Sequence, residues 1–308
     1  MKRDLVSLAD LGAPGVREIL EKSSMFERTR GTIAHPRPLA GLTVALLFDL
    51  PSTRTRIALE VAAVELGAHP MVIAGEDSQA SRGEPIEDTA RVLGRTVALV
   101  ACRTPKHTRL TALAAACAAP VINALTRKNH PLQVLADLHA VRAARGGVDG
   151  LRYAWLGDCT NVARSWIEAA GLLGLDFTIA SPPGYGPSPA DLPRDDGVVV
   201  TDDPRAAATS ADVILTDTWV SMGFEESAEA RQRALSPYRV TRELLALAAP
   251  GVNVLHCLPA HRGEEIDADA LDGPGSLVWD AVAARLPTAK AVLAWAAHGL
   301  AADRATPA

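Results

Sequence analysis

The segment FDLPSTRTR, residues 48–56, decides how the first half of the chain folds. It follows the apolar run Leu42–Phe48, which predicts a buried strand, and it opens a helical pattern over Thr53–Leu66. Ser52 is a natural N-cap residue for that helix. A strand that runs directly into a helix is typical of a βαβ unit.

Two arginines, Arg54 and Arg56, stand in the first turn of this helix. The helix dipole is positive there, so each cation costs about 0.3–1 kcal/mol, and a bound dianion would reverse that penalty. Hydroxyl groups of Ser52 and Thr53, backbone N–H groups and the arginines together predict a phosphate site. The alternative is that the arginines pair with carboxylates such as Glu60. The GxxxxGK[ST] pattern of a Walker loop is absent.

Strand and helix patterns alternate along the whole chain. The further strand-like runs are Val97–Ala101, Arg152–Leu156, Phe177–Ser181, Gly197–Thr201, Asp212–Thr216 and Val252–His256. The further helical patterns include Pro131–Arg145, Val162–Leu173 and Val240–Ala248. This alternation predicts an α/β fold with two doubly wound domains, each a mainly parallel sheet covered by helices on both faces.

A composition break at residues 142–150, RAARGGVDG, predicts the domain boundary. We expect a first domain over 1–145, completed by a C-terminal helix over 287–308 with Pro287 in its first turn. The second domain is expected over 146–286. The Pro-rich segment 181–196 is a loop by composition, and no function is evident for it.

Composition excludes several classes of protein. The 308 residues carry a formal net charge of −5, so nothing global recruits nucleic acid or an anionic membrane. No apolar run reaches the roughly 18–20 residues that span a bilayer, and the N-terminus lacks the apolar core of a signal peptide. We therefore expect a cytoplasmic protein. Four scattered cysteines without a CxxC pair indicate neither a zinc site nor a disulfide framework.

Five ordered motifs carry a resemblance to a known family. They are PSTRTR (51–56), EPIEDTARVL (84–93), HPLQ (130–133), DTWVSMG (217–223) and HCLP (256–259). They resemble the aspartate/ornithine carbamoyltransferase family, and the last two resemble its ornithine-using members. The resemblance implies transfer of a carbamoyl group from carbamoyl phosphate to the δ-amine of L-ornithine, in arginine biosynthesis, without cofactor or metal.

The resemblance also implies where carbamoyl phosphate binds. The residues assigned to it are Ser52, Thr53, Arg54, Thr55, Gln79, Arg103, His130, Gln133, Cys257, Leu258 and Arg285. Arg103, His130 and Cys257 are the catalytic candidates among them. The residues themselves leave other roles open: His130, before Pro131, could cap a helix or sit in a core, and Arg285 could be an ordinary surface arginine.

For ornithine, the resemblance assigns Asn161, Asp217, Ser221 and Met222. Asp217 follows a predicted strand and could accept hydrogen bonds from an α-ammonium group, although it could also cap a helix. A nucleophilic Cys257 would need an activating base. The resemblance instead implies that Cys257 and the Leu258 carbonyl orient the attack, while a buried inert thiol is the alternative. The Leu258–Pro259 bond is a candidate cis peptide.

The family implies a homotrimer or an assembly of trimers, in which Gln79 reaches the neighbouring subunit's site. Alternative acceptors are N-acetylornithine, putrescine and aspartate. A non-catalytic regulator on the same fold is a further alternative. A dehydrogenase is disfavoured because the turn at 157–165 reads GDCTNVARS, which is not GxGxxG.

Overall fold

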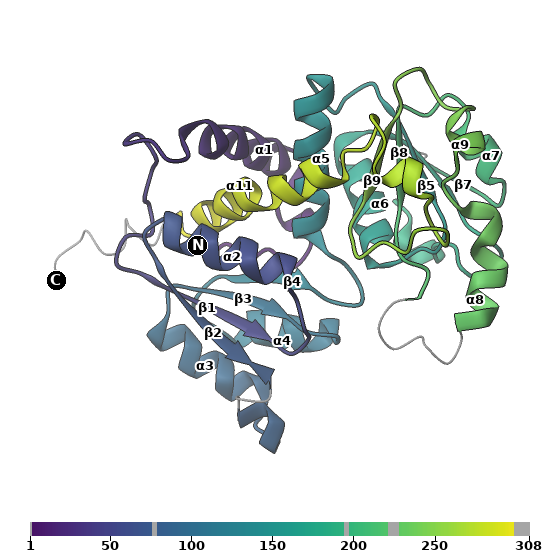
Figure 1. Ribbon diagram of the computed structural model, residues 1–308. Helices are drawn as coiled ribbons and strands as arrows, with labels where there is room; N and C mark the ends of the chain where they lie inside the picture. Colours follow the sequence, from purple (N-terminus) through teal and green to yellow (C-terminus); the bar gives the residue numbers. More distant parts are fainter. Residues whose placement is uncertain (1, 76–78, 194–196, 221–227, 299–308) are drawn as a thin grey trace. The chain divides into compact units, whose positions relative to one another are not determined.

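The computed structural model describes residues 2–75, 79–193, 197–220 and 228–298 (Figure 1). The chain divides into two compact units: Met1–His139 with Ala283–Ala308, and Ala140–Val282. Both units are built on a parallel sheet covered by helices, which confirms the expected fold class. Every helix in the described ranges is too short or too polar to cross a bilayer.

The first unit contains a four-stranded sheet in the order β2-β1-β3-β4. Its strands are β1 (Thr43–Phe48), β2 (His69–Ala74), β3 (Leu99–Arg103) and β4 (Val121–Leu125). Its helices are α1 (Gly12–Thr29), α2 (Arg54–Glu65), α3 (Ile86–Thr96), α4 (His107–Ala116) and most of α5 (Pro131–Arg145) and α11 (Val278–Ala296). Figure 1 shows α3 and α4 over one face of the sheet and α2 with α11 over the other.

Residue alternation in β1 explains this layering. Ala45 and Leu47 pack in one apolar cluster with Ile86 and Leu93 of α3 and Leu110 of α4. The intervening side chains of β1 are also fully buried. A central parallel strand must be apolar on both sides because helices cover both faces.

The second unit contains a five-stranded parallel sheet in the order β7-β6-β5-β8-β9. Its strands are β5 (Arg152–Leu156), β6 (Asp176–Ala180), β7 (Val198–Thr201), β8 (Val213–Thr216) and β9 (Asn253–His256). Its helices are α6 (Asn161–Leu173), α7 (Pro204–Ala208), α8 (Ala228–Leu235), α9 (Arg242–Leu245) and α10 (Ala268–Leu271). On one face Trp166 of α6 stacks on Phe177 of β6, with ring centroids 6.2 Å apart. On the other face α7, α9 and α10 pack on Ala154, Ile214 and Val254.

Helix α6 starts where the sequence indicates, because both of its ends are specified locally. The Thr160 side chain accepts hydrogen bonds from the N–H groups of Val162 and Ala163. Gly174 ends the helix in the left-handed region, at φ 67°. These caps fix the position of Asn161 as the first helical residue.

Two strands, β2 and β4, were not among the runs expected from sequence. Strand β2 contains Pro70, which weakens a strand pattern and is tolerated because β2 lies at the edge of its sheet. Strand β4 is a short run, VINAL, interrupted by the polar Asn123. Parallel pairing with β1 and β3 stabilises both segments beyond what their own patterns indicate.

Two helix starts were also predicted wrongly. Helix α11 begins at Val278, and Pro287 lies inside it rather than in its first turn. From Ala284 onward the helix is largely buried, so its packing there outweighs the cost of an internal proline. The N-cap of α2 is Thr53 rather than Ser52, and its side chain makes no capping hydrogen bond.

Candidate functional site

Each sheet has a topological switch point, which is the place between two neighbouring strands whose following helices cover opposite faces of the sheet. In the first unit it lies between β1 and β3, and in the second between β5 and β8. Open α/β sheets bind ligands beyond the carboxyl ends of the strands at such points. Phe48 pairs with Arg103 at the end of β1 and β3. The PSTRTR segment and Arg103 therefore flank the first switch point.

A buried cluster of cationic groups surrounds His130 in the first unit. Arg103 ends β3, His130 precedes α5, and Arg285 lies on α11; their exposed fractions are 9%, 4% and 8%. Burial, followed by the charges of Arg285, Arg103 and Arg54, holds the pKa of His130 well below its usual value. His130 is therefore neutral near pH 7, and the surrounding positive charge suits an anion.

Hydrogen bonds connect Arg285 to two other predicted site residues. Its guanidinium donates to Thr55 Oγ1 at 3.4 Å and to Gln133 Oε1. The other side of the Gln133 amide donates to Asp137 Oδ1 at 2.7 Å. Asp137 was missed by the sequence analysis, although its i,i+4 spacing from Gln133 on α5 was an available signal. The pair fixes which way the Gln133 amide faces.

The hydroxyl residues and the two first-turn arginines take different positions. Ser52 is half-buried and Thr53 exposed, directly before α2. The first N–H groups of a helix have no partner within it, so this end suits an anion. Arg56 pairs with Glu60 at 2.5 Å, which is the alternative considered from sequence. The charge of Arg54, in contrast, helps to lower the pKa of His130.

Gln79 is exposed at the start of a short 3₁₀ turn, Gln79–Arg82. In the part of the chain that the structure describes, its carbonyl accepts a hydrogen bond from the Glu84 N–H. The structure records no contact between Gln79 and the arginine cluster within this one chain.

Lowering the pH from 7 to 5 is expected to destabilise the wild type more steeply than a His130→Asn variant. The unfolded chain binds a proton at His130 near pH 6.5, whereas the folded chain resists it because the pKa is lowered. Stability therefore falls as the pH drops through 6.5, by up to about 1.4 kcal/mol per pH unit. Urea unfolding at pH 5, 6 and 7 measures this difference, and parallel profiles for the two proteins would contradict it. Other histidines titrate in both proteins and cancel.

In the second unit, Asp217 and Cys257 lie side by side just beyond the carboxyl ends of β8 and β9. Thr216 of β8 pairs with His256 of β9, so the next residue of each strand emerges at the same place. The Cys257 thiol donates to Asp217 Oδ1 at 2.8 Å. The Thr160 hydroxyl donates to Asp217 Oδ2, also at 2.8 Å. Asp217 is thus a held carboxylate rather than a helix cap.

The Leu258 backbone is held by a buried histidine and glutamate. Leu258 has φ 59° and is followed by a cis peptide to Pro259, as anticipated. Its N–H donates to His256 Nδ1 at 2.8 Å, and His256 Nε2 lies 3.1 Å from Glu265 Oε1. Both His256 and Glu265 side chains are fully buried. Glu265 follows His256 by nine residues, but no local pattern links the two side chains, so this support was not predicted.

Asn161 occupies the first position of α6, one residue after Thr160, and is half-buried. Thr160 was not predicted as a site residue, although a threonine before a helix start is a readable capping signal. Ser221 and Met222 lie outside the described residues. Of the predicted ornithine residues, the structure therefore places Asn161 and Asp217 at one sheet edge.

One group of described residues has the donor atoms for a metal ion. Ligand atoms of His261, Glu264 and Glu265 lie within 4.8 Å of one another. Glu265 already accepts hydrogen bonds from His256 and from the His261 N–H, at 3.1 and 2.5 Å. Its carboxylate therefore holds the HCLP segment in place.

Comparison with known proteins covers nearly the whole chain. Residues 3–143 match the family model described as the aspartate/ornithine carbamoyltransferase carbamoyl-P binding domain. Residues 149–296 match the Asp/Orn binding domain of the same family. A protein from Acidothermus cellulolyticus named ornithine carbamoyltransferase is 48% identical over 304 residues, covering 96% of each chain.

Solved structures give the same result. The ornithine carbamoyltransferase from Pyrococcus furiosus matches with a TM-score of 0.92 and 40% identity, over 97% of this chain and 98% of its own. The enzyme of that name from Thermus thermophilus matches with a TM-score of 0.88 and 40% identity, over 96% of this chain and 99% of its own.

Proposed function

The chain belongs to the aspartate/ornithine carbamoyltransferase family, and we propose that it transfers the carbamoyl group of carbamoyl phosphate to the δ-amine of L-ornithine. The products are L-citrulline and phosphate. The observation that carries this proposal is the buried arginine cluster around a neutral His130, beyond the switch point of the first sheet. A cluster with this excess of positive charge suits a phosphate dianion.

Carbamoyl phosphate binds first in the proposed mechanism. Its phosphate contacts Ser52, Thr53, Arg54, Thr55 and Arg285, which neutralise the leaving group. Hydrogen bonds and charge placed in advance around a leaving group or oxyanion are usually the largest catalytic contribution.

The carbamoyl group lies on the other side of the same cluster. Arg103, His130 and Thr55 stabilise the carbonyl oxygen as it gains negative charge. Gln133 accepts a hydrogen bond from the carbamoyl NH2 group. The Gln133 Oε1 atom accepts from Arg285 in this structure. We therefore propose that Arg285 turns to the phosphate as the substrate binds and releases this acceptor.

Ornithine binds on the second domain through its α-amino and carboxylate groups. Asn161, Asp217, Ser221 and Met222 form this part of the site. Cys257 and the Leu258 carbonyl orient the δ-amine toward the carbonyl carbon without a covalent intermediate. The amine must lose its proton before attack, because an alkylammonium of this type has a reference pKa of about 10.4.

We further propose the cellular and quaternary setting. The protein acts in the cytoplasm in arginine biosynthesis, as a homotrimer or an assembly of trimers, in which Gln79 reaches a neighbouring subunit's site. Carbamoyl phosphate binds the domain of residues 1–145 with 287–308, and ornithine binds residues 146–286.

Parallel assays with four acceptors test the function. We expect citrulline from carbamoyl phosphate and ornithine, and at least 100-fold lower kcat/KM with the other three acceptors. Putrescine lacks the α-carboxylate, the α-amine of N-acetylornithine is blocked, and aspartate has no δ-amine to attack. Sites built around polar contacts of this kind discriminate by about 10⁴–10⁵. Each product is measured separately. Turnover with another acceptor would overturn the assignment of the second domain. Phosphate binding without any turnover would indicate a regulator.

A further inference from the structure

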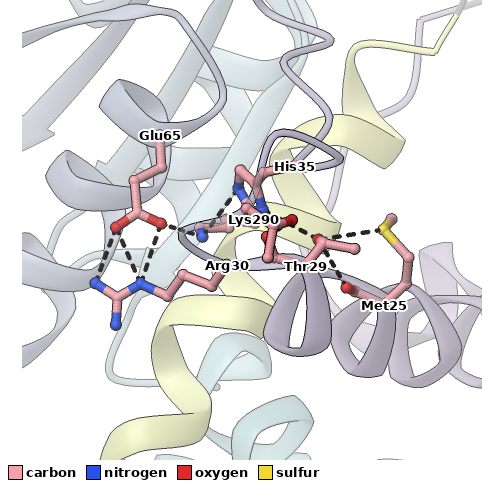
Figure 2. Close-up of polar contacts among 7 residues, drawn as sticks. Met25, Thr29, Arg30, His35, Glu65 and Lys290 are labelled. Atoms are coloured by element: carbon pink, nitrogen blue, oxygen red, sulfur yellow. Dashed lines mark hydrogen bonds and ion pairs between the residues drawn. The ribbon is translucent and has the colours of Figure 1, made fainter.

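A second charged cluster lies at the opposite end of α2 from the arginine site. Lys290 of α11 is 1% exposed, and its Nζ donates to Glu65 Oε2 at the last residue of α2. The Arg30 guanidinium, directly after α1, also donates to Glu65, with Nη2 2.9 Å from Oε1. Figure 2 shows Lys290 between Glu65 and His35, with Arg30 on the other side of the carboxylate.

The hydrogen bonds define the protonation of His35. An ammonium group can only donate, so His35 Nε2, 3.2 Å from Lys290 Nζ, accepts. His35 Nδ1 then keeps its proton and donates to Thr29 Oγ1 at 3.1 Å, while the Thr29 hydroxyl donates to the Met25 carbonyl. Burial and the charge of Lys290 lower the pKa of His35, in agreement with a neutral ring. Lys290 is thus held from two sides.

Both ends of α2 carry the charge that the helix dipole disfavours. Arg54 stands at the positive end and Glu65 at the negative end. Burial alone would raise the pKa of Glu65, but its hydrogen bonds from Arg30 and Lys290 lower it below the usual value. A buried ion pair contributes little net stability compared with an apolar pair of the same size, whereas it restricts geometry strongly. The Lys290–Glu65 pair is therefore better explained by the geometry that it imposes on the two helices than by its contribution to stability.

Helices α2 and α11 are connected at two places. At the site, Arg285 donates to Thr55 in the first turn of α2. Five residues further along α11, Lys290 reaches the last residue of α2. Between them a small hollow is lined by Ala58 and Leu59 of α2 and Ala289 of α11, together with Thr55, Leu132 and Arg285. A hollow means that the apolar side chains around it are not fully interlocked, so the packing there restricts sliding of one helix along the other less than a filled interface would.

We propose that Lys290 is a positioning residue for the phosphate site. Through Glu65 it fixes α11 lengthwise against α2, and this sets where the Arg285 guanidinium lies relative to the first turn of α2. The proposal rests on the proposed function, because it assumes that this turn and Arg285 bind the phosphate group. Side chains that hold a binding group must do so to within a fraction of an ångström, and misplacement by 1 Å can cost up to about 100-fold in rate.

The test uses Lys290→Met, Glu65→Gln and the double variant. We expect each single variant to weaken binding of inorganic phosphate, measured by calorimetry, and to raise the KM for carbamoyl phosphate, both by about tenfold. The KM for ornithine at saturating carbamoyl phosphate should change less than twofold. The double variant should be no worse than the poorer single variant, because both act through one contact.

The matched control is Lys22→Met, which removes a partly exposed lysine paired with Glu18 on α1 of the same unit. Its phosphate affinity and both KM values should equal those of the wild type. A folded Lys290→Met protein with lower stability but unchanged phosphate affinity would overturn the proposal, as would additive losses in the double variant. If Lys290→Met does not fold, Glu65→Gln decides alone, since Glu65 is 24% exposed. A wild type without phosphate binding or turnover would refute the proposed function instead.

Discussion

Replacing Arg54 by glutamine is expected to lower kcat/KM for carbamoyl phosphate by about 10²–10³-fold. This is the usual loss when one hydrogen-bond donor is removed from a site that stabilises negative charge developing in the transition state. Arg54 stands in the first turn of α2, and its charge acts on the buried His130. Glutamine is shorter than arginine and keeps some hydrogen-bonding capacity, but it removes the charge. Steady-state kinetics with varied carbamoyl phosphate measure the loss.

The matched control is Arg56→Gln, two residues away in the same turn. Arg56 is half-exposed and pairs with Glu60 along the helix surface. Exposed i,i+4 pairs contribute only about 0.3–0.5 kcal/mol, so this variant should keep kcat/KM within about twofold. Equal losses in both variants would show that the two arginines serve the substrate together. Equal retention would refute the phosphate site at this turn.

The local pattern at the helix start does not distinguish these two arginines, whereas the family resemblance assigns Arg54 alone to carbamoyl phosphate. Both break the same rule about charge at a helix start, and both fit the motif. The difference arises from helix geometry, because Arg56 lies one turn from Glu60, whereas the charge of Arg54 acts on the buried His130. The local pattern thus predicts a phosphate site at this turn, and the different surroundings of the two arginines favour Arg54 as the one that serves it.

Elements with a complete local signal were predicted well, and others depended on neighbours. Strand β5 and helix α5 have the expected bounds, because an apolar run and a helix-starting proline specify them. Edge strand β2 and the start of α11 were missed. Their local sequences contain a proline, and its cost is offset only by pairing or burial that a single sequence does not display.

The candidate site shows the same division. Residues that follow strands, such as Arg103, Asp217 and Cys257, could be anticipated because strand ends gather at the switch point. The contacts that hold them could not, because Thr160 donates to Asp217 across 57 residues and no local pattern links Glu265 to His256. Sequence identifies groups that can meet a substrate more readily than the groups that orient them.

Replacing Asp217 by asparagine is expected to lower kcat/KM for ornithine by about 10²–10³-fold, with phosphate affinity unchanged. This is the loss expected when a buried charged partner of a substrate ammonium becomes neutral. Kinetics with varied ornithine at saturating carbamoyl phosphate measure it, and calorimetry with inorganic phosphate measures the other half of the site. A loss in phosphate affinity equal to the loss for ornithine would contradict the separation of roles.

The matched control lies at the other end of the same strand. Asp212 precedes β8, and its side chain accepts a hydrogen bond from the Arg152 N–H at 2.9 Å. Asparagine can still accept there, so Asp212→Asn should alter stability by less than about 1 kcal/mol and leave both KM values unchanged.

The hydrogen bonds around Asp217 make this comparison specific to charge. The asparagine oxygen can still accept from the Cys257 thiol and the Thr218 N–H, and the Thr160 hydroxyl can rotate to accept from the new amide. The strand ends therefore stay in place while the negative charge disappears. Unchanged ornithine kinetics in Asp217→Asn would mean that this carboxylate only holds the thiol and the helix cap, and the ammonium of the acceptor would have to be bound elsewhere.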